Sequence, residues 1–244
     1  MKRKPAGRTH FTSSAELRAH LRDLSPDGKI VLAFSRGKDA IAAWLALRDS
    51  FEVVPYYCDP IPGLAVIEES VAYYERVFAT KIHRFPHPSL YRQLRNLVFQ
   101  PPERWTAIVA ADLPRVKGSN PFADVDRRTR ELCGSPQAFV ATGVRAADSL
   151  NRRLSILHRG PVRWSDRTAM VVYDWTLGDI ETAMRRADVR LPIDYEWFGR
   201  SFDGIDHMFV EPLRRHAPED YRRVLERFPL CDLEMFRREM ANGA

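Results

Sequence analysis

Two kinds of apolar pattern alternate along the first two thirds of the chain. Short unbroken apolar runs, typical of strands buried in a parallel sheet, occupy residues 29–34, 51–57, 81–85 and 138–142. Apolar residues at helical spacing lie between and after them, over 40–48, 64–78, 90–99, 123–133 and 146–157. Strands that alternate with helices indicate βαβ units. The pattern therefore predicts an α/β fold, a parallel twisted sheet of about five strands with helices on both faces.

The two ends of the chain depart from this alternation. Residues 1–14 are basic and read as a poorly ordered lead-in, and a short helix follows with Ser13 or Ser14 as its cap. Helical spacing returns late in the chain, over 175–187, 218–228 and 233–240. We therefore expect one α/β domain over 15–215 and a helical C-terminal extension over 216–244.

Arginine dominates the charge of the sequence. The 244 residues carry 38 Lys and Arg against 32 Asp and Glu, a net charge of +6, and only 6 of the 38 cations are lysines. Arginine is the cation suited to planar, bidentate contacts with carboxylate and phosphate. The excess fits a solvated basic surface as well as it fits an anionic partner, and composition leaves both open.

Composition also excludes several classes of protein. No apolar run approaches the roughly 18 residues of a membrane span, and the basic start lacks the apolar stretch of a signal peptide. The three cysteines, Cys58, Cys133 and Cys231, are scattered and form no C-x-x-C pair, so neither a zinc site nor an iron–sulfur cluster is expected. We expect a cytoplasmic protein with no membrane partner.

A candidate anion site follows the first predicted strand, at Ser35-Arg-Gly-Lys-Asp39. A loop between a buried strand and a helix directs backbone N–H groups and the helix N-terminus at one spot. Gly37 allows a close turn, Lys38 adds a full positive charge and Ser35 adds a hydroxyl. These groups suit the phosphates of a nucleotide. An ordinary turn with an accidental lysine is the alternative.

A second candidate segment, 141–153, follows the strand predicted at 138–142. Parallel sheets place ligands beyond the carboxyl ends of their strands, so both segments point to the same site. Gly143 would admit a base or ribose and Arg145 would meet phosphate. Asp148 and Ser149 open the next helix, and Arg152 or Arg153 lies one turn further on. A capped helix with solvated arginines is the alternative.

These segments resemble the PP-loop, or N-type, ATP pyrophosphatases. Ser35-Arg-Gly-Lys-Asp39 is similar to their S-G-G-K-D-S loop. Gly143-Val-Arg-Ala-Ala-Asp-Ser149 with Arg152 resembles the G-x-R-x-x-E-S-x-x-R segment of their phosphoadenylyl-sulfate (PAPS) reductase branch. Asp59 ends a strand where that branch has Asp-Thr-Gly. Later stretches, 173–179, 191–195 and 198–201, fit the branch in the same order, so the resemblance covers roughly residues 29–215.

The departures from the family pattern narrow what the resemblance implies. Arg36 replaces a loop glycine and either reaches the phosphates or points outward, Ala40 replaces the final Ser or Thr, and Asp148 replaces Glu. The Gly-Cys-x-x-Cys of many relatives is absent, so no iron–sulfur cluster is implied. The cluster-free reductases use a C-terminal cysteine, but the surroundings of Cys231 do not match theirs, and a small apolar residue under the last helix is the alternative.

The resemblance implies an adenine nucleotide alpha-hydrolase-like fold and an enzyme that cleaves ATP to AMP and pyrophosphate while adenylating an acceptor. It implies Lys38, Asp39 and Arg145 as catalytic residues. The nucleotide-binding residues would be Ser35, Arg36, Gly37, Lys38, Asp59, Gly143, Arg145, Asp148, Ser149 and Arg152. Mg²⁺ is expected with ATP, and Asp39 is the nearest carboxylate, although an Asp favoured by the helix dipole explains it equally well. A loop at 199–206 would bring Arg200, Asp203 or Asp206 to the acceptor, or form an ordinary turn.

The acceptor stays open at the level of sequence. The arginines favour a nucleic acid or a nucleotide, and stand-alone relatives of this kind occur in bacteriophage genomes, which would place the protein in a host cytoplasm. One alternative is a PAPS reductase that releases sulfite, which needs a reactive cysteine. Another is a non-catalytic module that binds an adenine nucleotide or nucleic acid. A homodimer is compatible with all three.

Overall fold

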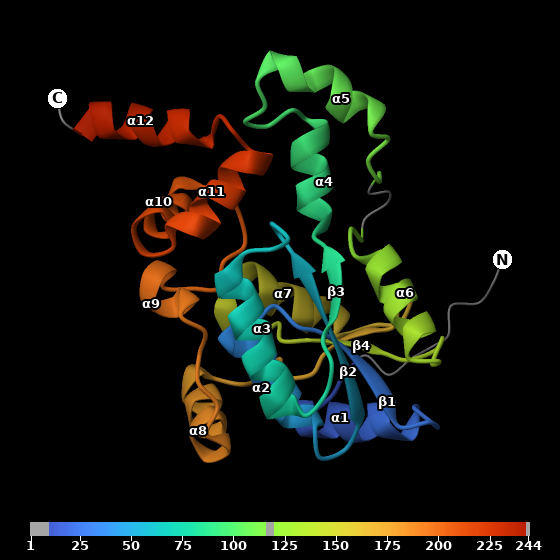
Figure 1. Cartoon of the computed structure of the whole chain (residues 1–244). Coiled ribbons are helices and arrows are strands. Elements are labelled where there is room, and N and C mark those ends of the chain that lie inside the picture. Colours follow the sequence, from blue (N-terminus) through green and yellow to red (C-terminus); the bar gives the residue numbers. More distant parts are fainter. Residues whose placement is uncertain (1–9, 116–119, 243–244) are drawn as a thin grey trace. The chain divides into compact units, whose positions relative to one another are not determined.

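A six-stranded sheet organises the part of the chain that this computed structural model describes, residues 10–115 and 120–242 (Figure 1). The strands run in the order β3-β2-β1-β4-β6-β5. Their bounds are β1 Lys29–Ala33, β2 Glu52–Asp59, β3 His83–Pro86, β4 Val140–Thr142, β5 Val162–Arg163 and β6 Thr168–Met170. β1 pairs in parallel with both β2 and β4, β4 pairs in parallel with β6, and only the edge strand β5 is known to be antiparallel to its neighbour. The predicted α/β class with a mainly parallel sheet is confirmed.

The helices have these bounds: α1 Ser14–Asp23, α2 Lys38–Leu47, α3 Ala65–Phe78, α4 Pro88–Arg95, α5 Trp105–Ala110, α6 Ala123–Leu132, α7 Leu150–Arg159, α8 Leu177–Ala187, α9 Asp194–Phe198, α10 His207–His216, α11 Pro218–Arg227 and α12 Cys231–Asn242. Two short 3₁₀ helices, η1 Pro102–Arg104 and η2 Ala146–Asp148, complete the set. The helix expected over 146–157 is therefore two elements, because Ser149 is extended and caps α7 (φ −165°).

The sequence missed the short elements of the fold. β5 and β6 have only two and three residues, too few to display a period of two. α9 and α10 were also not predicted, and α10 carries Pro212 inside it. The helical C-terminal region that the sequence predicted is present, and it begins earlier than expected.

Aromatic rings join β1 to the helices that follow it. Ile30, Val31 and Leu32 of β1 are completely buried. Phe34 meets Phe78 edge-on with ring centroids 5.1 Å apart, and Phe78 stacks on Trp44 of α2 at 3.9 Å. α2 is apolar on most of its surface and packs against α8 as well as β1 and β4. The strand–turn–helix unit that carries the first candidate segment is thus firmly held.

The chain divides into two compact units. The first contains residues 1–57, 75–83 and 122–191, and the second contains 58–74, 84–121 and 192–244. The boundary expected at 215/216 falls inside α10, within the second unit. Residues 1–9 of the expected lead-in lie outside the described residues. Of the remainder, Phe11 accepts a hydrogen bond from the Tyr173 hydroxyl at 2.9 Å, and the Ser13 side chain caps α1.

Within residues 10–115 and 120–242, no helix combines the length and apolar character needed to cross a lipid bilayer.

Candidate functional site

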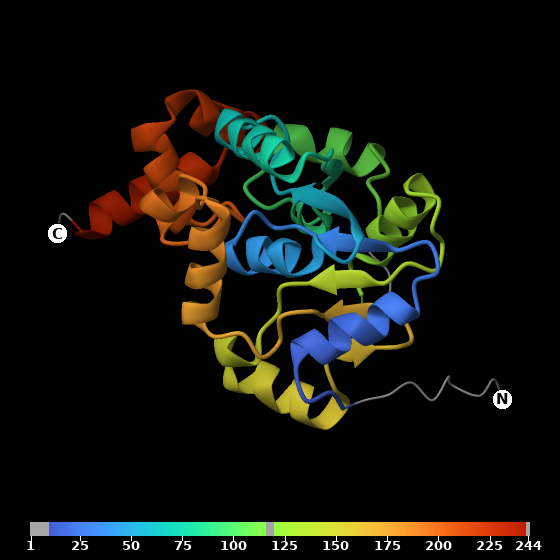
Figure 2. The same cartoon turned by 90° about the horizontal axis from the view of Figure 1, so that it is seen from below.

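The strand order of the sheet has its topological switch point next to β1. The chain adds β2 and β3 on one side of β1 and then places β4 on the other, with parallel pairing on both sides (Figure 2). In open α/β sheets ligands bind beyond the carboxyl ends of the strands at this switch point. Residues 35–39 follow β1 and residues 143–152 follow β4, so both candidate segments lie at this end of the first unit.

The turn from β1 into α2 presents an uncapped helix N-terminus. Gly37 is the N-cap residue of α2, and no side chain makes a capping hydrogen bond there. The Gly37 N–H lies 3.4 Å from the Ser35 hydroxyl, while the first backbone bonds of the helix run from Ala40 and Ile41 to the Gly37 carbonyl. An uncapped N-terminus carries a partial positive charge and N–H donors, which favours an anion.

Arg36 does not point outward into solvent. Its backbone is left-handed (φ 62°), unusual for a non-glycine residue, and its side chain is completely buried. The guanidinium lies over the Tyr57 ring, 5.1 Å from the ring centroid. Of the two orientations predicted from sequence, the outward one is wrong, because the side chain is buried. The sequence could not reveal this, because the residue type permits both. Nucleotide binding by Arg36 stays a prediction.

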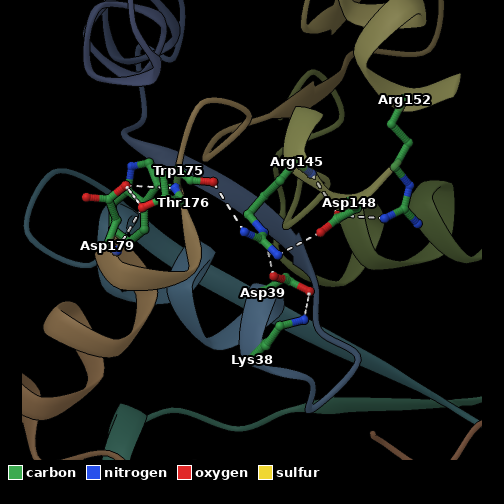
Figure 3. A network of polar contacts seen from close by, with 8 residues as sticks. All are labelled: Lys38, Asp39, Arg145, Asp148, Arg152, Trp175, Thr176 and Asp179. Atoms are coloured by element: carbon green, nitrogen blue, oxygen red, sulfur yellow. Dashed lines mark hydrogen bonds and ion pairs between the residues drawn. The ribbon is translucent and has the colours of Figure 1, made fainter. Parts of the chain in front are cut away.

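A network of ion pairs joins the two candidate segments (Figure 3). Lys38 Nζ lies 2.9 Å from Asp39 Oδ2, and Arg145 Nε lies 2.7 Å from Asp39 Oδ1. Arg145 continues the network, with Nη2 2.7 Å from Asp148 Oδ1 and Nη1 donating to the Trp175 carbonyl at 3.2 Å. One guanidinium thus connects the segments that follow β1, β4 and β6.

Arg152 closes the network from α7. Its Nη1 lies 2.6 Å from Asp148 Oδ2, and its backbone N–H donates to the Ser149 hydroxyl at 3.2 Å. Three cations and two carboxylates give the network a net positive charge. Arg145 is 6 % exposed at its side chain, whereas Lys38 is 30 % and Arg152 is 51 % exposed. The accessible cations are therefore Lys38 and Arg152, and Arg145 is mostly enclosed.

Gly143 makes the close approach of the two segments feasible. A Cβ atom at this position would lie 2.3 Å from the Asp39 carbonyl oxygen and 2.8 Å from the Ala40 nitrogen. Both are backbone atoms of α2, which cannot move aside cheaply. The sequence suggested that Gly143 makes room for a base or ribose. In the structure, glycine is needed at this position because a side chain would collide with the backbone of α2.

The β6–α8 segment is a third contributor that sequence reasoning did not place in the site. Thr176 caps α8 reciprocally with Asp179: the Thr176 N–H donates to Asp179 Oδ2 at 2.7 Å, and the Asp179 N–H donates to the Thr176 hydroxyl at 3.3 Å. The Thr176 N–H and the Thr176 hydroxyl both donate to the Asp179 carboxylate and hold its pKa below its usual value. The cap fixes the chain next to the Trp175 carbonyl that Arg145 binds (Figure 3). The Thr-x-x-Asp spacing is the sequence signal that could have indicated it.

Asp59 belongs to a different network, in the second unit. It is 4 % exposed, and Arg84 holds it with two donors, Nε to Oδ2 at 2.8 Å and Nη2 to Oδ1. Arg84 also donates to both carboxylate oxygens of Glu68, at 2.9 and 3.0 Å. Burial by itself would lower the pKa of Arg84, but the two carboxylates outweigh it and raise it. Nucleotide binding by Asp59 stays a prediction. The sequence signal that could have indicated the ion pair is Arg84, a charged residue within the short strand β3.

The expected acceptor loop also lies in the second unit. Arg200 Nη2 lies 2.5 Å from Asp203 Oδ2, and burial raises the pKa of Asp203. Asp206 is the N-cap residue of α10, with no side-chain cap bond. A role for these three residues toward an acceptor stays a prediction.

Cys231 has the environment of a core residue. It is 2 % exposed at the start of α12, and its Sγ lies 3.7 Å from the Ile205 carbonyl oxygen. Burial, followed by the charges of Asp206, Asp232 and Glu234, raises the pKa of the thiol to about 12. A thiol that stays protonated is a poor nucleophile, so the environment favours the packing role over a catalytic one.

The carboxylates of the network do not form a metal centre by themselves. Both oxygens of Asp39 are in ion pairs, and nowhere in residues 10–115 and 120–242 do three or more His, Cys, Asp or Glu side chains gather as a metal site would require. A magnesium ion at Asp39 would have to displace Lys38 or Arg145.

Comparisons with known proteins found distant structural similarity and no sequence match. The sequence matches no protein-family model and no curated protein. Among solved structures, the NH3-dependent NAD synthetase from Campylobacter jejuni in complex with the nitrate ion has a TM-score of 0.42 at 10 % identity, covering 92 % of each chain. The U34-tRNA thiolase NcsA from Methanococcus maripaludis with its [4Fe-4S] cluster has a TM-score of 0.45 at 10 % identity, covering 95 % of this chain and 88 % of that one. These likenesses assign no activity to this chain. Its own topology and charges define a doubly wound α/β protein with a basic site at the switch point.

Proposed function

We propose that this protein is an ATP-cleaving enzyme of the PP-loop type. It binds ATP at the carboxyl ends of β1 and β4, transfers AMP to an acceptor and releases pyrophosphate. The observation that carries the proposal is the network of Lys38, Asp39, Arg145, Asp148 and Arg152 beside the uncapped start of α2. Backbone donors, a helix dipole and accessible cations at one switch point are what a polyphosphate requires.

The reaction needs little covalent chemistry from the protein. An acceptor oxygen attacks the α-phosphorus of ATP, the bond from that phosphorus to the bridging oxygen breaks, and pyrophosphate leaves with the electron pair. Charge therefore develops on the leaving group, and donors aimed at it lower the barrier. Lys38, 30 % exposed, exchanges Asp39 for a phosphate oxygen, and the backbone N–H groups at the start of α2 assist it.

Arg145 acts in this proposal as a positioning residue. Its guanidinium contacts Asp39, Asp148 and the Trp175 carbonyl, and its enclosed side chain leaves little surface for a ligand. By holding Asp39 it orients the first turn of α2, and by holding Asp148 it orients Arg152. The sequence predicted that Arg145 itself contacts the phosphates. In this proposal Arg145 instead positions Lys38 and Arg152, which contact them.

In this proposal Mg²⁺ enters the site bound to the phosphates of ATP. The described carboxylates form no cage, and Mg²⁺ is usually bound through substrate phosphates with few protein ligands. Bound in this way, Mg²⁺ would neutralise phosphate charge. Asp39 is the nearest group to orient its water shell.

Calorimetric titration with pyrophosphate and with MgATP tests the proposal. Lys38→Ala removes a charge-assisted contact of about 1.5–3 kcal/mol, so we expect about a 10- to 100-fold loss of pyrophosphate affinity. Lys81→Ala is the matched control, because Lys81 is an 87 % exposed lysine of the same unit and its loss changes net charge equally. Absence of pyrophosphate and ATP binding by the wild-type chain, or equal effects of both substitutions, would refute the proposal.

The PAPS reductase alternative predicts a different response. It requires a cysteine nucleophile, and Cys231 is buried with a raised pKa. Sulfite release from PAPS that is lost in Cys231→Ser would establish it. No observation in the described residues favours it over ATP cleavage.

A further inference from the structure

The first unit carries further exposed arginines beyond the network, on α7 and the short strand that follows it. Between Asp148 and Asp166 the sequence contains no Asp or Glu, and this stretch comprises α7 and β5. Arg153 and Arg159 of α7 are exposed, and so is the side chain of Arg163 at 62 %. With Arg130 and Arg167 these residues form what we call the basic strip.

Few carboxylates offset the charge of the basic strip. Within the described residues, the strip has one ion pair with a carboxylate, between Arg163 and Asp166 at 3.8 Å. Arg130 donates to the carbonyl oxygens of Ala138 and Asp166, each at 2.8 Å. Arg167 stacks over the Phe139 ring at 4.1 Å, and burial together with the nearby charge of Arg130 lowers its pKa. By contrast, Arg127 of α6 and Arg222 of α11 pair with acids in their own helices, whereas Arg153 and Arg159 of the strip are exposed and have no such pair among the described residues.

The basic strip is connected to the candidate site through α7. This helix begins at Leu150, directly after the cap residue Ser149, and runs about 15 Å to Arg159. Its first turn carries Arg152 of the network. Ile156 is its one buried residue, so α7 is a surface helix (Figure 2). A ligand that contacts the strip must carry repeated negative charge over this length, which a single nucleotide does not.

We propose that the basic strip binds the sugar–phosphate backbone of a nucleic-acid strand and presents that strand to the candidate site as the acceptor. The acceptor role rests on the proposed function, whereas the binding surface does not. The strand contacts Arg153, Arg159 and Arg163 through its phosphates, so binding is strongly salt-dependent and tolerant of sequence.

α7 also offers a second kind of surface. Leu150, Leu154 and Leu157 are 68 %, 42 % and 64 % exposed at i, i+4 and i+7. An apolar stripe of this spacing is suited to a partner helix. The leucine stripe involves α7 alone, whereas the arginines of the basic strip extend over α6, α7, β5 and the residue before β6. Because the arginines extend over more of the surface than the leucines, we favour a nucleic acid over a partner helix. The experiment must distinguish these two ligands.

Fluorescence anisotropy with labelled single-stranded 20-mers of DNA and of RNA, between 50 and 200 mM salt, tests the surface. Arg159→Gln with Arg163→Gln removes two phosphate contacts, so we expect affinity to fall at least tenfold and the logarithmic salt slope to decrease by about 1.4. The matched control is Arg185→Gln with Arg186→Gln, two exposed arginines at the end of α8 in the same unit. Its affinity should stay within twofold of wild type, and circular dichroism checks that both variants fold.

Three results would overturn the proposal. They are no binding of either oligonucleotide at 50 mM salt, equal losses in the strip variant and the control, and a loss confined to Leu154→Ser with Leu157→Ser. The last result would indicate apolar docking.

Pyrophosphate titration separates this proposal from the proposed function. The strip variant should keep its pyrophosphate affinity, and Lys38→Ala should keep its oligonucleotide affinity. Oligonucleotide binding without pyrophosphate binding sinks the ATP-cleaving function and with it the acceptor role. Pyrophosphate binding without oligonucleotide binding sinks the basic strip alone.

Discussion

Single residues at the switch point show how tightly the two candidate segments are joined. Gly143 permits backbone contact with α2, and Arg145 makes three polar contacts from an enclosed position. Lys38 remains partly exposed beside them. The residues therefore divide into those that assemble the site and those that can meet a ligand.

Gly143→Ala should destabilise the protein because its Cβ would overlap the Asp39 carbonyl group. Overpacking of this kind costs about 1–3 kcal/mol in the free energy of unfolding. Urea denaturation measures the loss. Gly178→Ala is the control, since a Cβ there meets only the Thr176 hydroxyl at 3.7 Å and alanine favours a helix. A Gly143→Ala protein as stable as wild type would show that the segments are not this close.

The Cys231 thiol should resist alkylation in the native protein. With a pKa raised to about 12, it stays protonated at pH 7 to 9.5, so its reaction with iodoacetamide should not accelerate over that range. Unfolding in urea returns the pKa toward its ordinary value and should make the residue reactive. Peptide mass spectrometry measures both states, and rapid native labelling at pH 8 would contradict the assignment.

At the scale of elements, side chains distant in sequence anchor the helices. Asp220 of α11, 1 % exposed, accepts the Ala65 N–H at 2.7 Å and the Val66 N–H at 2.9 Å at the start of α3. Arg223 lies 2.8 Å from the same carboxylate. α11 is thus tied into the second unit, since its Asp220 caps one of the earlier helices.

Asp220→Ala should weaken the second unit because the N–H groups of Ala65 and Val66 lose a charged acceptor. The expected loss is about 1–3 kcal/mol in the free energy of unfolding, measured by urea denaturation. Asp220→Asn keeps one acceptor and should lose less. Glu226→Ala on the same helix, at an exposed position, should change stability by no more than about 0.5 kcal/mol. An Asp220→Ala chain that matches Glu226→Ala would argue against the cap.

For the whole molecule, the two units should respond differently to a ligand. The network lies within the first unit, and α10 to α12 lie in the second. We expect pyrophosphate to slow amide hydrogen exchange over 34–41 and 143–153 and to leave 207–230 unchanged. Mass spectrometry of the exchanged peptides measures this. Protection confined to 207–230 would place the anion elsewhere.

The sequence by itself determined the α/β class and the two segments that meet at the switch point. Buried parallel strands and amphipathic helices impose composition over many residues, so their pattern is legible along the chain. β5 and β6 were not legible, because two or three residues cannot display a period.

Only the tertiary structure decided what each side chain does. From sequence, Asp39 could bind a metal ion or simply be stabilised by the helix dipole. Arg36 could reach a phosphate or point into solvent, and Arg145 could contact a ligand or other parts of the protein. The folded chain pairs Asp39 with Lys38 and Arg145, buries Arg36 over Tyr57, and encloses Arg145. A charged side chain takes its role from the partners within a few ångströms, and those partners come from segments that only folding brings together.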